Sequence, residues 1–153
     1  MIFTFIRRHP RIAIGGGLLF ILVALSLLAP LIAPYDPMKL AVARRLRPPG
    51  AEHWFGTDAY GRDVLTRTLY GGQISLLIAV SVALLSTVLG TVIGLVGGYF
   101  RAMDTVVMRV MDGLMAIPGI LLAVAMLSLS KASIQTVIIA ITIPEIPRVV
   151  RLV

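Results

Sequence analysis

The densest group of polar and charged residues lies between Trp54 and Asp63. Its two glycines permit tight turns, and its threonine and first aspartate can cap a following helix. Its arginine and two aspartates can form a local ion network, while Trp54 and Tyr60 are typical of membrane interfaces. The pattern predicts a structured turn on a membrane surface, with a structural or partner-docking role. The residues that carry it are Gly56, Thr57, Asp58, Gly61, Arg62 and Asp63.

No other group has the spacing that catalysis or cofactor binding needs. The only histidines, His9 and His53, lie in different polar segments without a neighbouring carboxylate pattern, which argues against a metal site. The chain has no cysteine, which excludes thiol catalysis and Cys-ligated metals. Neither GxxxxGK[ST] nor GxGxxG occurs, so any nucleotide would be bound by another chain. We therefore expect no enzyme activity, no cofactor and no catalytic, cofactor-binding or metal-binding residue.

The composition indicates what kind of protein positions this turn. Of the 153 residues, 58% are hydrophobic and 14% are charged, and the mean hydropathy is +0.98. A soluble domain of this size cannot bury so much apolar surface, so the sequence predicts an all-α polytopic membrane protein. The net charge is +7, with basic residues beside apolar runs. This arrangement favours contact with membrane lipid and argues against nucleic acid as a partner.

Four apolar runs are candidates for membrane spans. The first, residues 12–33, holds no charge and exceeds the roughly 20 residues that a spanning helix needs. The alternative, a cleaved signal peptide, would have a shorter apolar run of about 7–15 residues. The prolines and mixed charges of residues 34–73 predict an extracytoplasmic loop. Within it, residues 63–70 are expected to form a short interfacial helix capped by Asp58. The predicted segments are a terminus at 1–11 and about four transmembrane helices at 12–33, 74–99, 109–129 and 132–150.

Small residues recur every fourth position in the second span, at Ser86, Gly90, Gly94 and Gly98. Such a strip lets another helix approach closely, and packing drives helix association in lipid. The alternative explanation is that glycine is simply common in membrane spans. The regular spacing favours a packing ridge.

The third span contains an acid one turn inside its predicted start. Arg109 and Asp112 are i,i+3 neighbours, so an ion pair between them is feasible. An acid within a span is a candidate functional group, but at this shallow depth we favour a paired structural anchor. Pro118 is expected to bend the span.

The distribution of basic residues gives the orientation only weakly. Equal numbers of basic residues fall on the two predicted sides of the membrane. Arg7, Arg8 and Arg11 flank the first span directly, whereas the loop 34–73 mixes its basic residues with acids. The density of positive charge favours a cytoplasmic N-terminus.

Three longer motifs contain many of the charged residues and glycines of the chain. The first is Phe55-Gly56-Thr57-Asp58-x-x-Gly61-Arg62-Asp63-Val64-Leu65-x-Arg67-x-x-Tyr70-Gly71-Gly72. The second is Gly97-Gly98-Tyr99-Phe100, followed by Asp104, Met108-Arg109, Asp112 and Ile117-Pro118. The third is Pro147-Arg148-x-x-Arg151-Leu152-Val153. Together these motifs resemble the C-type permease subunits of peptide/nickel ABC importers, and the resemblance covers nearly the whole chain.

The resemblance implies a permease with six helices in the intact family, a cytoplasmic N-terminus and an outer Gly56–Asp63 loop. It implies import by alternating access, driven by ATP hydrolysis on separate cytoplasmic ATPase subunits. The other implied partners are a second permease subunit and an extracytoplasmic substrate-binding protein, at a bacterial or archaeal cell (inner) membrane. The family's cytoplasmic Glu-Ala-Ala…Gly motif would begin just after Val153, so this chain is expected to be an N-terminal fragment.

A non-transporting membrane anchor or scaffold subunit is the alternative function. It accounts for the composition and the spans, but it leaves the Gly56–Asp63 cluster unexplained. The family transports dipeptides, oligopeptides, nickel, glutathione and some oligosaccharides, and the sequence does not choose among them.

Overall fold

The structure is a computed structural model that describes residues 10–129 and 133–153. Arg7, Arg8, His9, Lys131 and the predicted helix start at residue 132 lie outside the described residues. The chain divides into two compact units, Met1–Leu76 and Leu77–Val153. The regular elements in the described ranges are all helices. One isolated β-bridge joins Thr57 and Asp63. This confirms the predicted all-α class.

Two helices are each long and apolar enough to cross a membrane, α2 (Pro10–Leu27) and α4 (Val64–Tyr99). A third span is added if α5 (Arg101–Ala116) and α6 (Gly119–Leu129) are counted together as one broken span. These two helices meet at an angle of 83°. The last helix, α7 (Ile134–Val150), has 17 residues. It is roughly 26 Å long, a little shorter than a hydrocarbon core of about 30 Å. The chain is a multi-pass membrane protein.

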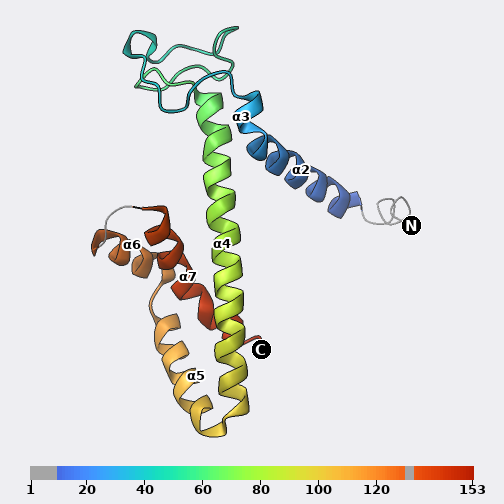
Figure 1. The fold of residues 1–153 in the computed structure, drawn as a ribbon, viewed down its shortest axis with the longest axis vertical. Coiled ribbons are helices and arrows are strands. Elements are labelled where there is room, and N and C mark those ends of the chain that lie inside the picture. Colours follow the sequence, from blue (N-terminus) through green and yellow to red (C-terminus); the bar gives the residue numbers. More distant parts are fainter. Residues whose placement is uncertain (1–9, 130–132) are drawn as a thin grey trace. The chain divides into compact units, whose positions relative to one another are not determined.

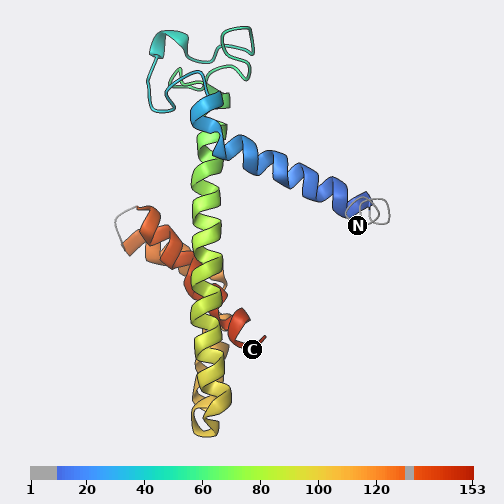
Figure 2. The same cartoon turned by 45° about the vertical axis from the view of Figure 1, so that its right-hand side comes forward.

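In the first unit, the predicted helix 12–33 is two helices. The apolar helix α2 ends at Leu27, and a short helix α3 (Ala29–Ile32) follows with a proline in its first turn. Pro30 lacks the backbone N–H that would donate to the carbonyl of Ser26, and its ring would clash with that carbonyl in a continuous helix, which explains the break at Leu28. An irregular segment with one 3₁₀ turn (Val42–Arg44) then leads to α4, as Figure 2 shows.

The helix α4 is longer than the sequence predicted. The expected interfacial helix 63–70 and the expected span 74–99 are one uninterrupted helix of 36 residues, visible in Figure 1. Residues 71–73 separated the two expected helices, but Gly71 and Gly72 do not interrupt the helical hydrogen bonds, and no proline lies in this stretch. Gly72 instead lies against Ser26 of α2, where a Cβ would overlap the Ser26 hydroxyl.

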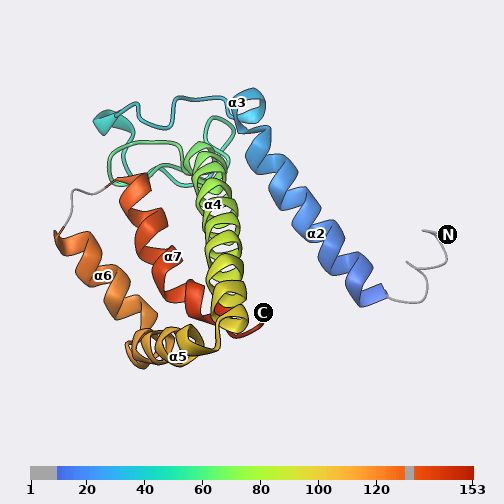
Figure 3. The same cartoon turned by 60° about the horizontal axis from the view of Figure 1, so that its bottom comes forward.

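In the second unit, the C-terminal part of α4 is followed by α5, α6 and α7. The helices α6 and α7 lie side by side (Figures 1 and 3). The helix α7 begins where the Ser133 hydroxyl accepts a hydrogen bond from the backbone N–H of Thr136. It continues through Pro144 and Pro147, and Pro147 is buried together with Ala140 and Val150.

Candidate functional site

The segment Gly56–Asp63, called here the signature loop, lies immediately before α4. Its two glycines occupy the left-handed backbone region, with φ of +72° at Gly56 and +75° at Gly61. A Cβ on Gly56 would lie 2.5 Å from the carbonyl oxygen of Arg47, and one on Gly61 would overlap the carbonyl oxygen of Ala41. Both the backbone angle and the close approach of another chain segment therefore require glycine.

Hydrogen bonds join the signature loop to residues 41–47. The backbone N–H of Thr57 donates to the carbonyl of Arg47 at 3.1 Å, and the N–H of Leu46 donates to the carbonyl of Asp58 at 3.1 Å. The Thr57 hydroxyl accepts from the Arg47 N–H at 2.9 Å and donates to the Arg44 carbonyl. Thr57 thus fixes the preceding segment and does not cap α4, contrary to the sequence prediction.

Asp58 organises the turn through four contacts. Its Oδ1 accepts from the backbone N–H groups of Tyr60 at 2.8 Å and Arg62 at 3.0 Å. Its Oδ2 pairs with Arg62 Nε at 2.8 Å and Arg67 Nη1 at 2.7 Å. Desolvation alone would raise the pKa of Asp58, but these hydrogen bonds hold it well below its ordinary value. The sequence predicted that Asp58 caps the helix, but its contacts lie within the turn. The ionised Asp58 carboxylate holds this turn together.

Asp63 caps α4 and pairs with a histidine. Its Oδ2 accepts from the backbone N–H of Thr66 at 2.8 Å, and its Oδ1 lies 2.9 Å from Nδ1 of His53. Both side chains are buried. Desolvation raises the pKa of Asp63, but the Thr66 and His53 contacts together leave it below the ordinary value. Asp63 therefore belongs to a His–Asp pair and not to the predicted ion network with Asp58 and Arg62.

The pairing of His53 could not be predicted from the sequence, because its partner Asp63 is ten residues away across a loop with no regular period. The Tyr35 ring packs on the His53 ring with centroids 4.8 Å apart, and the Tyr35 hydroxyl donates to the Glu52 carbonyl at 2.7 Å. Within the described residues, His53 Nε2 and Thr66 Oγ1 are buried without a hydrogen-bond partner. Among these residues, no three potential ligand side chains gather into a metal site.

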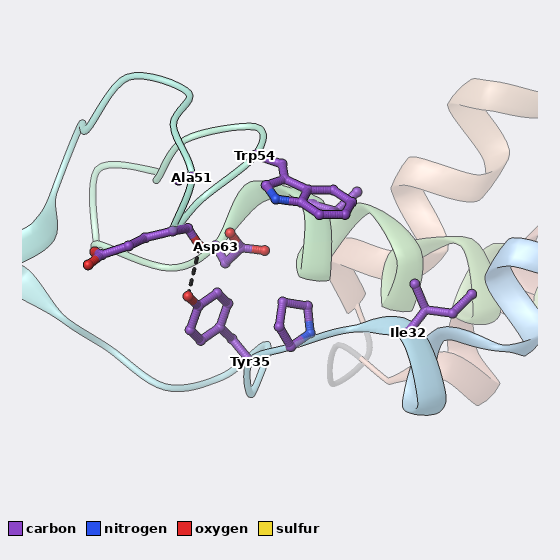
Figure 4. Close-up of a pocket in the computed structure, with 8 residues that line it drawn as sticks. Ile32, Tyr35, Ala51, Trp54 and Asp63 are labelled. Carbon is purple, nitrogen blue, oxygen red and sulfur yellow. Dashed lines mark hydrogen bonds between the residues drawn. The ribbon is translucent and has the colours of Figure 1, made fainter.

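A cavity of about 250 Å³ lies beside this pair (Figure 4). Tyr35 and Trp54 face it from opposite sides of the Asp63 carboxylate, and Ile32 lies at its apolar end. The lining residues are Ile32, Pro34, Tyr35, Ala51, Glu52, Trp54, Asp63 and Leu65. The predicted loop residue Asp63 is thus the only member of the signature loop that reaches the cavity.

In the second unit, three members of the predicted small-residue ridge are buried. A Cβ on Gly90 would lie 2.5 Å from Cβ of Val149, and one on Gly94 would lie 3.0 Å from Cβ of Val153. Ser86 is buried, and its hydroxyl donates to the Val82 carbonyl at 2.7 Å. A Cβ on Gly98 would meet nothing within 4 Å in the described structure. The close approach thus involves Gly90 and Gly94 of α4 with the C-terminal end of α7.

The acid of the third-span motif has a different partner from the one expected. Asp112 of α5 pairs with Arg151, which immediately follows α7, and no ion pair joins it to Arg109 among the described residues. The i,i+3 pair was feasible by spacing, but Arg151 comes within reach from another helix. Pro118 lies in the break between α5 and α6, where the 83° bend occurs.

A second cavity, of about 350 Å³, lies where α6 begins beside α7. Pro118, Gly119 and Pro144 line its apolar wall, and Glu145 and Arg148 line its polar side. Glu145 and Arg148 pair at 2.9 Å. The bend at Pro118 thus lies beside two charged side chains of α7.

Comparison with known proteins shows that the chain is similar to transport permeases. Residues 2–49 match the family model described as the N-terminal transmembrane domain of oligopeptide transport permease C. A putative peptide transport system permease of Brucella abortus is 48% identical over 146 residues, covering 95% of this chain and 49% of that protein. A probable peptide ABC transporter permease of Sinorhizobium fredii is 50% identical over 147 residues, covering 96% and 50%. A glutathione transport system permease of Pectobacterium atrosepticum is 37% identical over 152 residues, covering 97% and 50%.

The chain thus spans about half the length of the curated relatives it matches.

Proposed function

We propose that this chain, which is similar to peptide transport permeases along nearly its whole length, forms part of the translocation pathway of an ATP-driven importer. The identity to those permeases, up to 50% over 96% of the chain, is the observation that carries the proposal. The apolar helices α2 and α4 agree with it, because a pathway across a bilayer has to be built from such elements. The cargo is a peptide or a related small solute.

The chain contributes movement and no covalent chemistry in this proposal. Alternating access requires helices that shift against each other around a site near the middle of the membrane. The bend at Pro118 and the cavity beside α7 support a role for α6 and α7 in that movement. The charged pair Glu145–Arg148 supports the same assignment, because ionisable groups in membrane helices commonly mark solute pathways.

The signature loop would face the outside, with the N-terminus in the cytoplasm. Gly56, Thr57 and Asp63 are buried, so they would shape the loop and leave other residues to touch a partner. Trp54, Phe55 and Tyr60 are exposed and are the side chains available to dock a substrate-binding protein. The remaining partners would be a second permease subunit and cytoplasmic ATPase subunits, at a bacterial or archaeal inner membrane.

The test is to tag the chain in its own host, solubilise it in mild detergent and measure ATPase activity and copurifying subunits. A second strain, with the gene disrupted, is assayed for uptake of labelled dipeptides. We expect recovery of an ATPase and a second permease, together with loss of uptake. Recovery of the chain without any ATPase, together with unchanged uptake, would instead support a scaffold role.

The docking role of the loop is tested separately in the tagged strain with Phe55→Ala and Tyr60→Ala. We expect unchanged copurification of the permease and ATPase subunits but weaker crosslinking of the binding protein. Val106→Ala on α5, which removes an equally exposed apolar side chain, is the matched control. Unchanged crosslinking in both loop variants would remove the docking role and leave the loop purely structural.

A further inference from the structure

The cavity beside the His53–Asp63 pair combines aromatic and acidic lining residues. The rings of Tyr35 and Trp54 face it, and Asp63 and Glu52 are the acidic residues among those that line it. No basic side chain lines it among the described residues. Aromatic faces and carboxylates both attract cations, and neither attracts anions.

We propose that this cavity binds an organic ammonium group between Tyr35 and Trp54. Asp63 is 4% exposed, and each of its oxygens accepts from one protein donor. A carboxylate oxygen has two lone pairs, so each oxygen retains capacity for a further donor. The Glu52 side chain is largely exposed, so it can attract a cation from solution.

The basic groups near the cavity do not contradict this assignment. Arg47 lies 3.7 Å from Glu52, and His53 lies 2.9 Å from Asp63, but Arg47 and His53 do not line the cavity. A purely apolar guest fits less well, because it would supply no donor to the remaining lone pairs of the Asp63 carboxylate.

The volume limits what can enter. At about 250 Å³ the cavity is smaller than the 300–1,000 Å³ typical of sites that enclose a whole small molecule. It therefore holds a head group and leaves the remainder of the ligand outside. An α-ammonium at the start of a peptide and the side-chain ammonium of a lysine share this chemistry. The inference does not depend on the transport proposal, because it concerns binding alone.

Trp54 is the only tryptophan of the chain, so its fluorescence reports on this cavity without labelling. The purified 153-residue chain in dodecylmaltoside is titrated with glycyl-leucine, N-acetyl-glycyl-leucine and Nα-acetyl-lysine amide at constant ionic strength. We expect a saturable change in emission with at least one of the two ammonium compounds and none with N-acetyl-glycyl-leucine. A response to glycyl-leucine alone identifies the α-ammonium as the ligand, and a response to acetyl-lysine amide identifies a side-chain ammonium.

Three variants locate the response. Tyr35→Leu removes the ring and should weaken apparent affinity about tenfold, whereas Tyr35→Phe keeps the ring and should weaken it less. Glu52→Gln removes an exposed carboxylate with little risk to folding and should also weaken binding. Phe20→Leu removes an exposed aromatic side chain on α2 that does not line the cavity and should leave the titration unchanged. Equal responses to the acetylated and free dipeptides, or no saturable response to any compound, would overturn the proposal.

Discussion

The signature loop and the contact of α4 with α7 are held together in different ways. In the loop, Asp58 and Asp63 each accept from neighbouring backbone and side-chain donors, and Gly56 and Gly61 have positive φ. In the helical contact, Gly90 and Gly94 contribute by having no side chain, so that Val149 and Val153 can approach. The loop is specified by directed hydrogen bonds, and the helix contact is specified by shape, as expected where lipid removes the hydrophobic drive between helices.

This difference determines which changes each region tolerates. A substitution in the loop breaks a geometry that many hydrogen bonds share, whereas one in the helix contact only separates two surfaces. We therefore expect the largest losses at loop glycines and the smallest at exposed charges.

Gly61→Ala should give the largest effect. The change places a Cβ at positive φ and against the Ala41 carbonyl, so the loop should lose about 3 kcal/mol or more. The measurement is unfolding by SDS titration in dodecylmaltoside, followed by Trp54 fluorescence. Gly71→Ala is the matched control, since a Cβ there meets nothing within 4 Å. Equal losses of stability in both variants would show that the positive φ and close contact of Gly61 do not contribute to stability.

Gly90→Leu should come next. The added side chain would meet Val149, which must move, and the contact should lose about 2 kcal/mol. Far-UV circular dichroism during SDS titration measures this loss, and Trp54 fluorescence should barely change. Gly98→Leu faces open space and should change stability by less than about 0.5 kcal/mol. Similar effects of the two leucines would mean that the approach of α7 to α4 does not depend on glycine.

Asp63→Asn tests the loop through pH. The folded pKa of Asp63 lies below the unfolded value of 3.8, so the unfolded state binds more protons in this range. Its stabilising contribution is therefore present above pH 3.8 and is lost as pH falls through the folded pKa. We expect Asp63→Asn to cost about 1–2 kcal/mol at neutral pH and to reduce the loss of stability on acidification. If the Asp63→Asn variant loses as much stability on acidification as the unchanged chain, the pH dependence arises from other carboxylates.

Asp112→Asn should give the smallest effect. Asp112 and Arg151 are both largely exposed, and exposed pairs contribute about 0–1 kcal/mol. A double-mutant cycle with Arg151→Gln, measured by SDS titration, should return a coupling energy at the low end of that range. A coupling above about 2 kcal/mol would show that the pair is shielded from solvent and should be counted with the specific contacts of the loop.

The sequence predicted the elements better than their contacts. Apolar runs located α2 and α4, because lipid exposure leaves a composition signal in every residue. Pro118 marked the bend for a local reason, its missing N–H. The continuity of residues 63–70 with α4 was missed because the two segments were predicted separately, one from its amphipathic spacing and one from its apolar run. Gly71 and Gly72 lie inside α4, since glycine only weakens a helix.

The contacts that were missed join residues distant in sequence. His53 meets Asp63 across a loop, and Asp112 meets Arg151 between two helices, so no period or spacing reveals either pair. The N-cap role fell to Asp63 and not to Asp58 because α4 begins at Val64, a boundary that propensity does not fix to the residue. The glycines of the loop were read as turn formers, but their close contacts with Arg47 and Ala41 depend on the folded structure.

The central claim is that α4 crosses the membrane with the signature loop outside. The chain has no cysteine, so single cysteines can be introduced at Tyr60→Cys in the loop and Met103→Cys in α5, both exposed positions. Each is treated with a membrane-impermeant maleimide in spheroplasts, before and after permeabilisation. The account predicts that the cysteine at 60 is labelled at once and the one at 103 only after permeabilisation. Labelling of both from the same side, or of position 60 only after permeabilisation, would contradict it.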